Sequence, residues 1–169
     1  MAKDAIVSEE TAKKFAKEKE TPYTRWVKNE GLEIIDGIYV PDLHTVALKP
    51  WKRRNGHGVY INHDASRTSN DCYVCEIDPG EKLTEQRQLY EEMVMVLDGR
   101  GSTEVWNDAG QKVSFEWQAG ALFSIPLNCW HQHFNGSGLE PARYVAVTNA
   151  PVIMNAFGDL DFVFNTRRD

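Results

Sequence analysis

The sequence predicts an all-β fold, a sandwich or barrel of short strands that follows a short helical N-terminal extension. From residue 32 onward, short runs rich in β-branched and aromatic residues recur, and turn-forming pairs separate them. The chain has 169 residues, 41% of them hydrophobic and 26% charged, which suits one globular domain. We expect the helical extension over residues 1–31, the β-barrel over residues 32–150 and a tail over residues 151–169.

The extension contains two helical signals. Residues 8–19 have a thin apolar stripe among lysines and glutamates, which predicts a loosely docked helix with a solvated charged face. Thr21 and Pro22 resemble an N-cap followed by proline in the first helical position. The short helix that they start is expected to end near Gly31, a residue typical of helix C-termini.

The predicted strands are short and evenly spaced. Pairs such as Lys49-Pro50, Asn55-Gly56 and Pro79-Gly80 punctuate them as turns. We expect strands at residues 34–35, 38–40, 59–61, 73–77, 89–97, 103–106, 113–117, 122–125, 130–134 and 144–148. This many short strands indicates a sandwich or barrel.

The tail over residues 151–169 is apolar and ends in the alternation Phe162-Val163-Phe164. Such a segment has to pack against something. It is expected to dock either on its own barrel or across the interface of a homodimer.

Composition excludes several classes of function. The net charge of −6 and the lack of a long basic run disfavour a nucleic-acid or anionic-membrane partner. Apolar runs stop at strand length, so no membrane span is expected. The N-terminus has no apolar signal core, which favours a cytoplasmic protein. Cys72 and Cys75 lie three apart in an expected strand and face opposite sides, so buried reduced thiols are expected.

One expected strand carries His131, His133 and Asn135 at alternate positions. Side chains of a strand alternate between its faces, so these three polar groups share one face while Trp130 and Phe134 point the other way. Two imidazoles side by side form either a metal or proton-transfer site or a pair of ordinary core histidines.

A second alternation runs through Gln86, Gln88, Tyr90 and Glu92. We expect these residues to line the inward face of a barrel strand. Buried polar groups without partners cost about 1–3 kcal/mol each. A metal, water or ligand inside the barrel would supply the partners.

This second stretch resembles the first motif of the cupin superfamily, G-x5-H-x-H-x3-E-x6-G. Gly80, Glu92 and Gly99 occupy the positions of its first glycine, glutamate and closing glycine. Gln86 and Gln88 stand where the motif has its two histidines.

The histidine strand is similar to the second cupin motif, G-x5-P-x-G-x2-H-x3-N. Gly120, Pro126, His131 and Asn135 match it, and Asn128 replaces the internal glycine. The resemblance covers roughly residues 58–148. It implies a double-stranded β-helix, or jelly-roll, barrel with a site in its mouth.

The resemblance also implies a ligand set for a divalent metal, Fe, Mn, Ni or Zn. Carried over by position, the ligands are Gln86, Gln88, Glu92 and His131. A glutamine carbonyl is a neutral oxygen donor and binds such metals more weakly than imidazole does. His133 lies two residues beyond His131 on the same face, so Glu92, His131 and His133 are an alternative set of two histidines and one carboxylate.

The leading functional hypothesis is a metal-dependent oxygenase or lyase that acts on a small organic substrate in the barrel of a homodimer. In this hypothesis Tyr90 or the non-ligating histidine, His133, handles protons. One alternative is a metal-free binding or sensory protein. Another is a metal-free isomerase or lyase that uses His131 and Glu92 as base and acid.

Purely structural roles are also open to these residues. In one alternative, the barrel binds nothing, and Gln86 and Gln88 form a hydrogen bond with each other. In another, Glu92 forms an ion pair with an arginine such as Arg143. A buried carboxylate needs a cation or a proton nearby. Residues 51–70 are expected to supply part of the barrel mouth.

Overall fold

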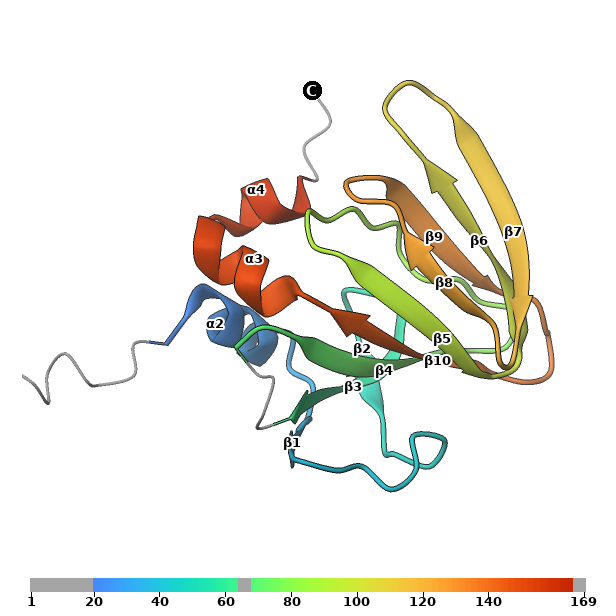
Figure 1. The fold of residues 1–169 in the computed structure, drawn as a ribbon. Coiled ribbons are helices and arrows are strands. Elements are labelled where there is room, and N and C mark those ends of the chain that lie inside the picture. The colour runs from blue at the N-terminus through green and yellow to red at the C-terminus, as the bar shows by residue number, and fades with distance from the viewer. Residues whose placement is uncertain (1–19, 64–67, 166–169) are drawn as a thin grey trace, which may run out of the picture.

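The computed structural model describes residues 20–63 and 68–165 of the chain. Within these residues the protein is mostly β, which confirms the predicted fold class (Figure 1). The strands are β1 (Ile34–Gly37), β2 (Lys49–Trp51), β3 (Gly56–His63), β4 (Asp71–Ile77), β5 (Glu92–Asp98), β6 (Arg100–Trp106), β7 (Lys112–Gln118), β8 (Leu122–Ile125), β9 (Trp130–Asn135) and β10 (Ala142–Thr148). The helices are α2 (Pro22–Asn29), α3 (Ala150–Phe157) and α4 (Leu160–Phe164). The helix expected at residues 8–19 lies outside the described part.

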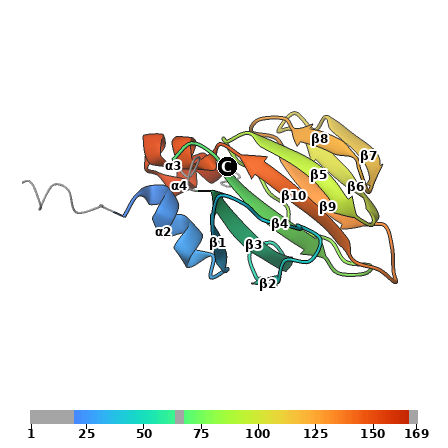
Figure 2. The ribbon, with the colours of Figure 1, turned by 60° about the horizontal axis from the view of Figure 1, so that its bottom comes forward.

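The strands form two sheets packed as a jelly-roll. The order in the larger sheet is β1-β3-β4-β10-β5-β8, with β2 beside β3, and the smaller sheet has the order β7-β6-β9. The neighbours β4, β10 and β5 come from distant parts of the chain, so long-range antiparallel pairing assembles the larger sheet. Figures 1 and 2 show the smaller sheet at one end of the molecule and the helices gathered at the other.

Helix α2 begins and ends at the expected residues. The Thr21 side chain accepts a hydrogen bond from the backbone N–H three residues later (3.2 Å), and Pro22 occupies the first helical turn. Gly31, two residues beyond the helix, has a φ of +70°, which favours glycine. The buried face of the helix consists of Tyr23, Trp26 and Val27.

Two predictions near the start of the barrel are wrong. Residues 38–40 form no strand, and Ile38 is 82% exposed. The reason is that Gly37, with a φ of +132°, turns the chain away at the end of β1. Lys49 and Pro50, expected as a turn, begin β2 and pair with β3. Because β2 is an edge strand, its proline interrupts no hydrogen bond of the sheet interior.

The polar stretch before Glu92 is also not a strand, because β5 begins only at Glu92. Residues 81–91 cross from the smaller sheet to the larger one. On the way Gln86 and His131 form an isolated antiparallel bridge, with both N–H···O distances at 2.9 Å. The expected alternation therefore lies on an extended crossing segment, whose pairing with β9 is limited to single bridges.

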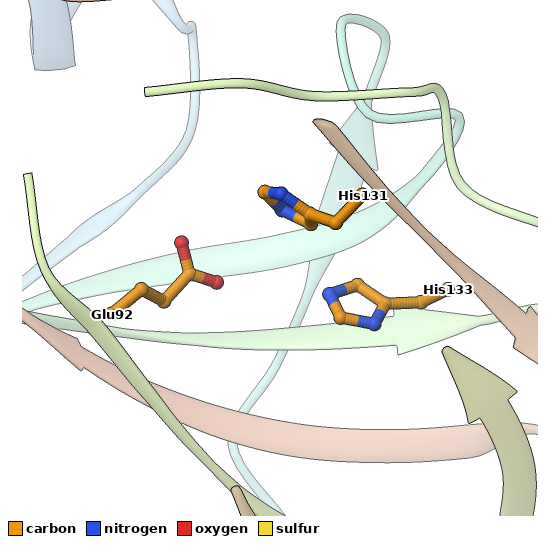
Figure 3. Close-up of side chains that lie close together, drawn as sticks. All are labelled: Glu92, His131 and His133. Carbon is orange, nitrogen blue, oxygen red and sulfur yellow. The ribbon is translucent and has the colours of Figure 1, made fainter. Parts of the chain in front are cut away.

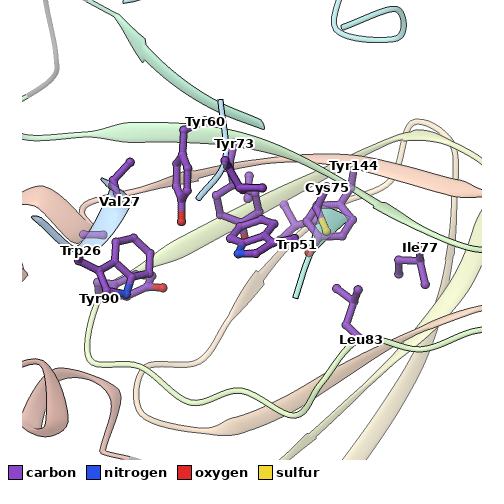
Figure 4. Packing of buried hydrophobic residues seen from close by; sticks show 14 of the residues in the cluster. Trp26, Val27, Trp51, Tyr60, Tyr73, Cys75, Ile77, Leu83, Tyr90 and Tyr144 are labelled. Atoms are coloured by element: carbon purple, nitrogen blue, oxygen red, sulfur yellow. The ribbon is translucent and has the colours of Figure 1, made fainter. Parts of the chain in front are cut away.

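The main core fills the space between the sheets and extends to the helices (Figure 4). Aromatic rings dominate it: Trp51 and Tyr73 meet edge to face at 5.2 Å, and Tyr73 and Tyr144 at 6.2 Å. A Cβ at position 58 would lie 2.5 Å from the Trp51 ring, so Gly58 is what allows Trp51 to pack against β3. Glycine at that position serves close packing within a strand rather than a turn.

The C-terminal tail, up to Asn165, packs on its own barrel. Val163 is fully buried in the main core, and its carbonyl accepts a hydrogen bond from the Leu89 N–H (2.8 Å). Phe164 lies 5.5 Å from the Trp26 ring, while Phe162 remains half exposed. The alternation at residues 162–164 thus belongs to a short helix with one buried side, not to a strand.

Cys72 and Cys75 are free thiols, as expected, but only Cys75 is fully buried, and Cys72 is partly exposed. Burial raises the pKa of the Cys75 thiol to about 11 and that of Cys72 to about 12, so both stay protonated near neutral pH. No helix of the described residues has the length and apolar character needed to span a membrane.

Candidate metal centre

Glu92, His131 and His133 converge inside the barrel (Figure 3). Glu92 comes from the first position of β5, and both histidines come from β9, across the interior. Their ligand atoms all lie within 4.8 Å of one another, and none of the three residues is more than 2% exposed. The alternation of His131 and His133 along β9 turns both rings inward, as the sequence predicts.

The Nε2 atom of His131 carries a free lone pair. Its Nδ1 atom lies 3.4 Å from the Cys129 carbonyl, which can only accept, so Nδ1 donates and Nε2 carries no proton in the neutral ring. Nε2 is buried and has no hydrogen-bond partner. Burial lowers the pKa of His131, although the nearby Glu92 opposes that shift. The ring is therefore neutral at pH 7, the form that binds metals.

His133 is held by a hydroxyl. Its Nδ1 atom lies 2.7 Å from Thr103 Oγ1, which also accepts a hydrogen bond from the Trp117 indole N–H (2.9 Å). When Thr103 accepts from Nδ1 as well, the lone pair of His133 is on Nε2, which is buried and has no partner. Burial, together with the neighbouring His131, lowers the pKa of His133 well below its usual value.

Glu92 is oriented by two donors. The Tyr73 hydroxyl donates to one carboxylate oxygen (2.6 Å), and the Gln88 amide donates to the other (2.8 Å). Arg54 is the nearest cation, with its guanidinium 3.9 Å from the carboxylate. The alternative prediction of an ion pair between Glu92 and Arg143 is wrong. Arg143 binds Glu76 instead, with N···O distances of 2.8 and 2.9 Å.

The two glutamines have different surroundings. Gln88 lies at the site, where its amide donates a hydrogen bond that positions Glu92. Its amide nitrogen is therefore bonded to Glu92 and not to Gln86. Gln86 is buried, and its amide nitrogen has no partner. A buried donor without an acceptor marks a place where a bound molecule would complete the hydrogen bonding.

Tyr90, expected to handle protons, is buried toward the helical end of the barrel, with its ring 6.1 Å from Phe164. Burial and the neighbouring Glu92 raise its pKa. Two other tyrosines contact the site directly. Tyr73 hydrogen-bonds Glu92, and the Tyr144 ring lies 5.4 Å from His133.

Sequence reasoning missed Arg54, Tyr73, Thr103 and Tyr144. The three β-strand residues lie on inward faces of β4, β6 and β10, so the alternation of those strands was a usable signal. Arg54 had no such signal, because it lies in the turn between β2 and β3, inside the 51–70 stretch expected at the barrel mouth.

The residues fit a divalent metal. Two neutral imidazoles and one carboxylate, brought together by two strands, form a set that leaves open coordination positions. Both imidazole Nε2 atoms are buried without partners, which is costly in an apolar interior unless a cation or donor completes them.

Residues 73–148 match the family model described as a cupin domain. These residues are identified as a cupin domain. The match runs from Tyr73 in β4 to the end of β10 and so includes every residue of the candidate metal centre except Arg54. No curated protein sequence matches the chain.

Solved structures share the fold of this cupin domain at low identity. The cupin domain of Schizosaccharomyces pombe Cnp3 has a TM-score of 0.55 and 16% identity, covering 70% of this chain and 75% of that one. Oxalate decarboxylase from Lactobacillus farciminis, in a formate complex, has a TM-score of 0.53 and 21% identity, covering 66% of this chain. Oxalate oxidase has a TM-score of 0.53 and 17% identity, covering 66% of this chain and 58% of its own. This chain spans only 35% of the oxalate decarboxylase.

Proposed function

We propose that this cupin is a divalent-metal-dependent enzyme of oxygenase or lyase type that acts on a small organic substrate inside the barrel. The observation that carries the proposal is the buried cluster of Glu92, His131 and His133, whose ligand atoms lie within 4.8 Å of one another and whose two Nε2 atoms have no hydrogen-bond partner. Carboxylate and imidazole ligands suit Fe and Mn, and Ni and Zn also accept imidazole. Oxalate decarboxylase and oxalate oxidase share the fold, which makes lyase and oxidase chemistry natural candidates.

The metal, when bound, would act as a Lewis acid that polarises a substrate oxygen. The protein's own residues orient the ligands. Tyr73 and Gln88 hold the Glu92 carboxylate, and Thr103 holds the His133 ring. Such contacts keep ligand side chains in place before the metal arrives.

Protons at the site would be handled by a tyrosine. Burial raises the pKa of Tyr73 well above its usual value, so this hydroxyl remains a donor at neutral pH. We propose Tyr73 for this role in preference to Tyr90, because the Tyr73 hydroxyl already lies 2.6 Å from the Glu92 carboxylate.

One observation favours the alternative of a metal-free binding protein. Arg54 already places a positive charge 3.9 Å from Glu92, so the buried carboxylate has a counter-charge without a metal. In that case Gln86 and the two histidines would hydrogen-bond a polar ligand. Metal content separates the two functions.

The test is elemental analysis of protein purified without chelator or histidine tag, before and after reconstitution with Mn(II), Fe(II), Ni(II) or Zn(II). We expect close to one equivalent of metal in the wild-type protein. Glu92→Gln removes the anionic ligand and is expected to weaken metal binding about 10–100-fold or more.

Glu116→Gln is the matched control, because Glu116 is an exposed carboxylate on β7 and should leave metal content unchanged. Less than about a tenth of an equivalent in the wild-type protein, with no gain on reconstitution, would contradict the proposal. Full metal content in Glu92→Gln would place the site elsewhere.

A further inference from the structure

Arg54 is a cation enclosed in the protein. It is completely buried, and its guanidinium lies over the ring of Trp51, at 4.6 Å, and over the ring of Tyr73, at 4.4 Å. One terminal nitrogen donates to the Tyr144 hydroxyl (3.1 Å). These contacts hold the planar guanidinium in one orientation beside the metal centre.

The hydrogen bonding of Arg54 is incomplete. Its Nε atom is buried without a partner. Its ion pair with Glu92 spans 3.9 Å, which is longer than a hydrogen bond. Glu92 is already engaged by Tyr73 and Gln88. A buried guanidinium with an unpaired N–H donor would stabilise a negatively charged hydrogen-bond acceptor beside it.

The charges around the site point the same way. Arg54 and Glu92 are the charged side chains that face each other at the site. Glu92 contributes one negative charge, and Asp71 contributes another from the first position of β4, where the hydroxyls of Tyr23 and Thr148 donate to it. A divalent metal adds two positive charges to the one of Arg54. At least one positive charge then remains in an interior of low dielectric constant.

We propose that Arg54 binds the carboxylate group of the substrate and that the metal and this anion load cooperatively. The inference rests on the metal-dependent function proposed above. Without metal, Arg54 is the counter-charge of Glu92. Once a metal takes over the Glu92 carboxylate, Arg54 is left as an uncompensated buried cation, and a carboxylate matches its fork of N–H donors. The substrate class is therefore a small carboxylic acid.

The test measures Mn(II) binding by calorimetry, with and without saturating acetate, at matched ionic strength. Acetate is a probe for the carboxylate group. In the wild-type protein we expect acetate to tighten Mn(II) binding by about tenfold or more, because it neutralises the charge that the metal leaves behind.

The variant Arg54→Met keeps much of the side chain's volume and removes its charge. We expect Mn(II) to bind Arg54→Met at least as tightly as the wild-type protein, and acetate to change that affinity less than about twofold. Arg53→Met is the matched control. Arg53 is the adjacent arginine, paired with Glu30 instead of Glu92, and should leave the acetate effect intact.

The outcomes separate the two proposals. If the wild-type protein binds no Mn(II) in either buffer, the titration is repeated with Fe(II), Ni(II) and Zn(II), and failure with all four metals overturns the metal-dependent function and the coupling with it. A wild-type protein that binds Mn(II) without any effect of acetate overturns only the role of Arg54. An acetate effect that survives in Arg54→Met does the same. The wild-type measurement decides the coupling even if Arg54→Met proves too unstable to purify.

Discussion

At the scale of single residues, the site depends on which nitrogen of each imidazole is free. The Cys129 carbonyl determines the tautomer of His131, and the Thr103 hydroxyl holds His133. Both anchors contact Nδ1, which leaves both buried Nε2 atoms without a hydrogen-bond partner. Strand alternation points both histidine side chains inward, but the hydrogen bonds to Nδ1 are what determine the orientation of each ring.

Burial of these groups predicts a pH dependence of stability. The folded-state pKa values of His131 and His133 lie below the usual 6.5, so stability present above pH 6.5 is lost as the pH falls. Asp71 works in the opposite direction. Burial raises its pKa from 3.8 to about 6, so the folded state gains stability as the pH falls from about 6 to about 4.

Asp71→Asn should therefore make the metal-free protein more sensitive to acid. Between pH 6 and pH 4 the variant is expected to lose up to about 3 kcal/mol more unfolding free energy than the wild-type protein, because the compensating protonation is gone. Urea unfolding at a series of pH values measures this. Asp78→Asn, at a half-exposed carboxylate, is the control. Parallel stability profiles for the wild type and Asp71→Asn would contradict the prediction.

At the scale of elements, the C-terminal helices close the end of the barrel that lies away from the smaller sheet (Figure 1). Helix α4 has only five residues and is too short to be stable alone, so it depends on packing. Val163 supplies that packing, and its carbonyl receives the Leu89 N–H from the segment that leads to Glu92. The tail thus supports the segment that positions the candidate metal ligand.

Val163→Ala is expected to lower the unfolding free energy by about 2 kcal/mol, since it removes two buried methyl groups and leaves a cavity. Phe162→Ala, on the half-exposed side of the same helix, should cost well under half as much. Urea denaturation compares the two variants. Equal losses would mean that the tail does not pack on the barrel through Val163.

At the scale of the whole molecule, part of the outer sheet surface is apolar. Met93, Met95, Leu122 and Val147 are each about half exposed or more. They lie together, because Met93 pairs with Val147 and Met95 with Leu122 across neighbouring strands. A contiguous apolar patch of this kind on a sheet favours burial against another molecule.

The expected homodimer remains a prediction. We now expect its interface to include this apolar patch and not the C-terminal tail. We expect a dimeric mass by light scattering at micromolar concentration, and a monomeric mass for the double variant Met93→Glu, Met95→Glu. Leu139→Glu is the control, because Leu139 is 91% exposed in the loop before β10 and away from the patch. A monomeric wild-type protein would rule out the dimer.

Much of the fold was predictable from local patterns. Period-two alternation and turn residues placed most strands, and the Thr21-Pro22 signal placed α2. The errors lie where local preference competes with pairing. Residues 89–91 have strand composition, but they belong to a segment that crosses between sheets. Strand β2 contains a proline as its second residue, in a Lys-Pro pair that is typical of a turn. No local pattern tells whether a partner strand is present.

For the site, the sequence alone determined that Glu92 and His131 occupy cupin motif positions and that His131 and His133 share a strand face. Both conclusions follow from spacing along one chain segment, which a strand converts directly into direction. The tertiary structure decided the rest. It brought His133 close enough to Glu92 to share a metal. It also placed the Gln88 amide in hydrogen-bond contact with the Glu92 carboxylate, and Arg54 beside that carboxylate from the turn between β2 and β3. Contacts between distant segments depend on how the sheets pair and pack, and that information is spread over the whole chain rather than held in any one motif.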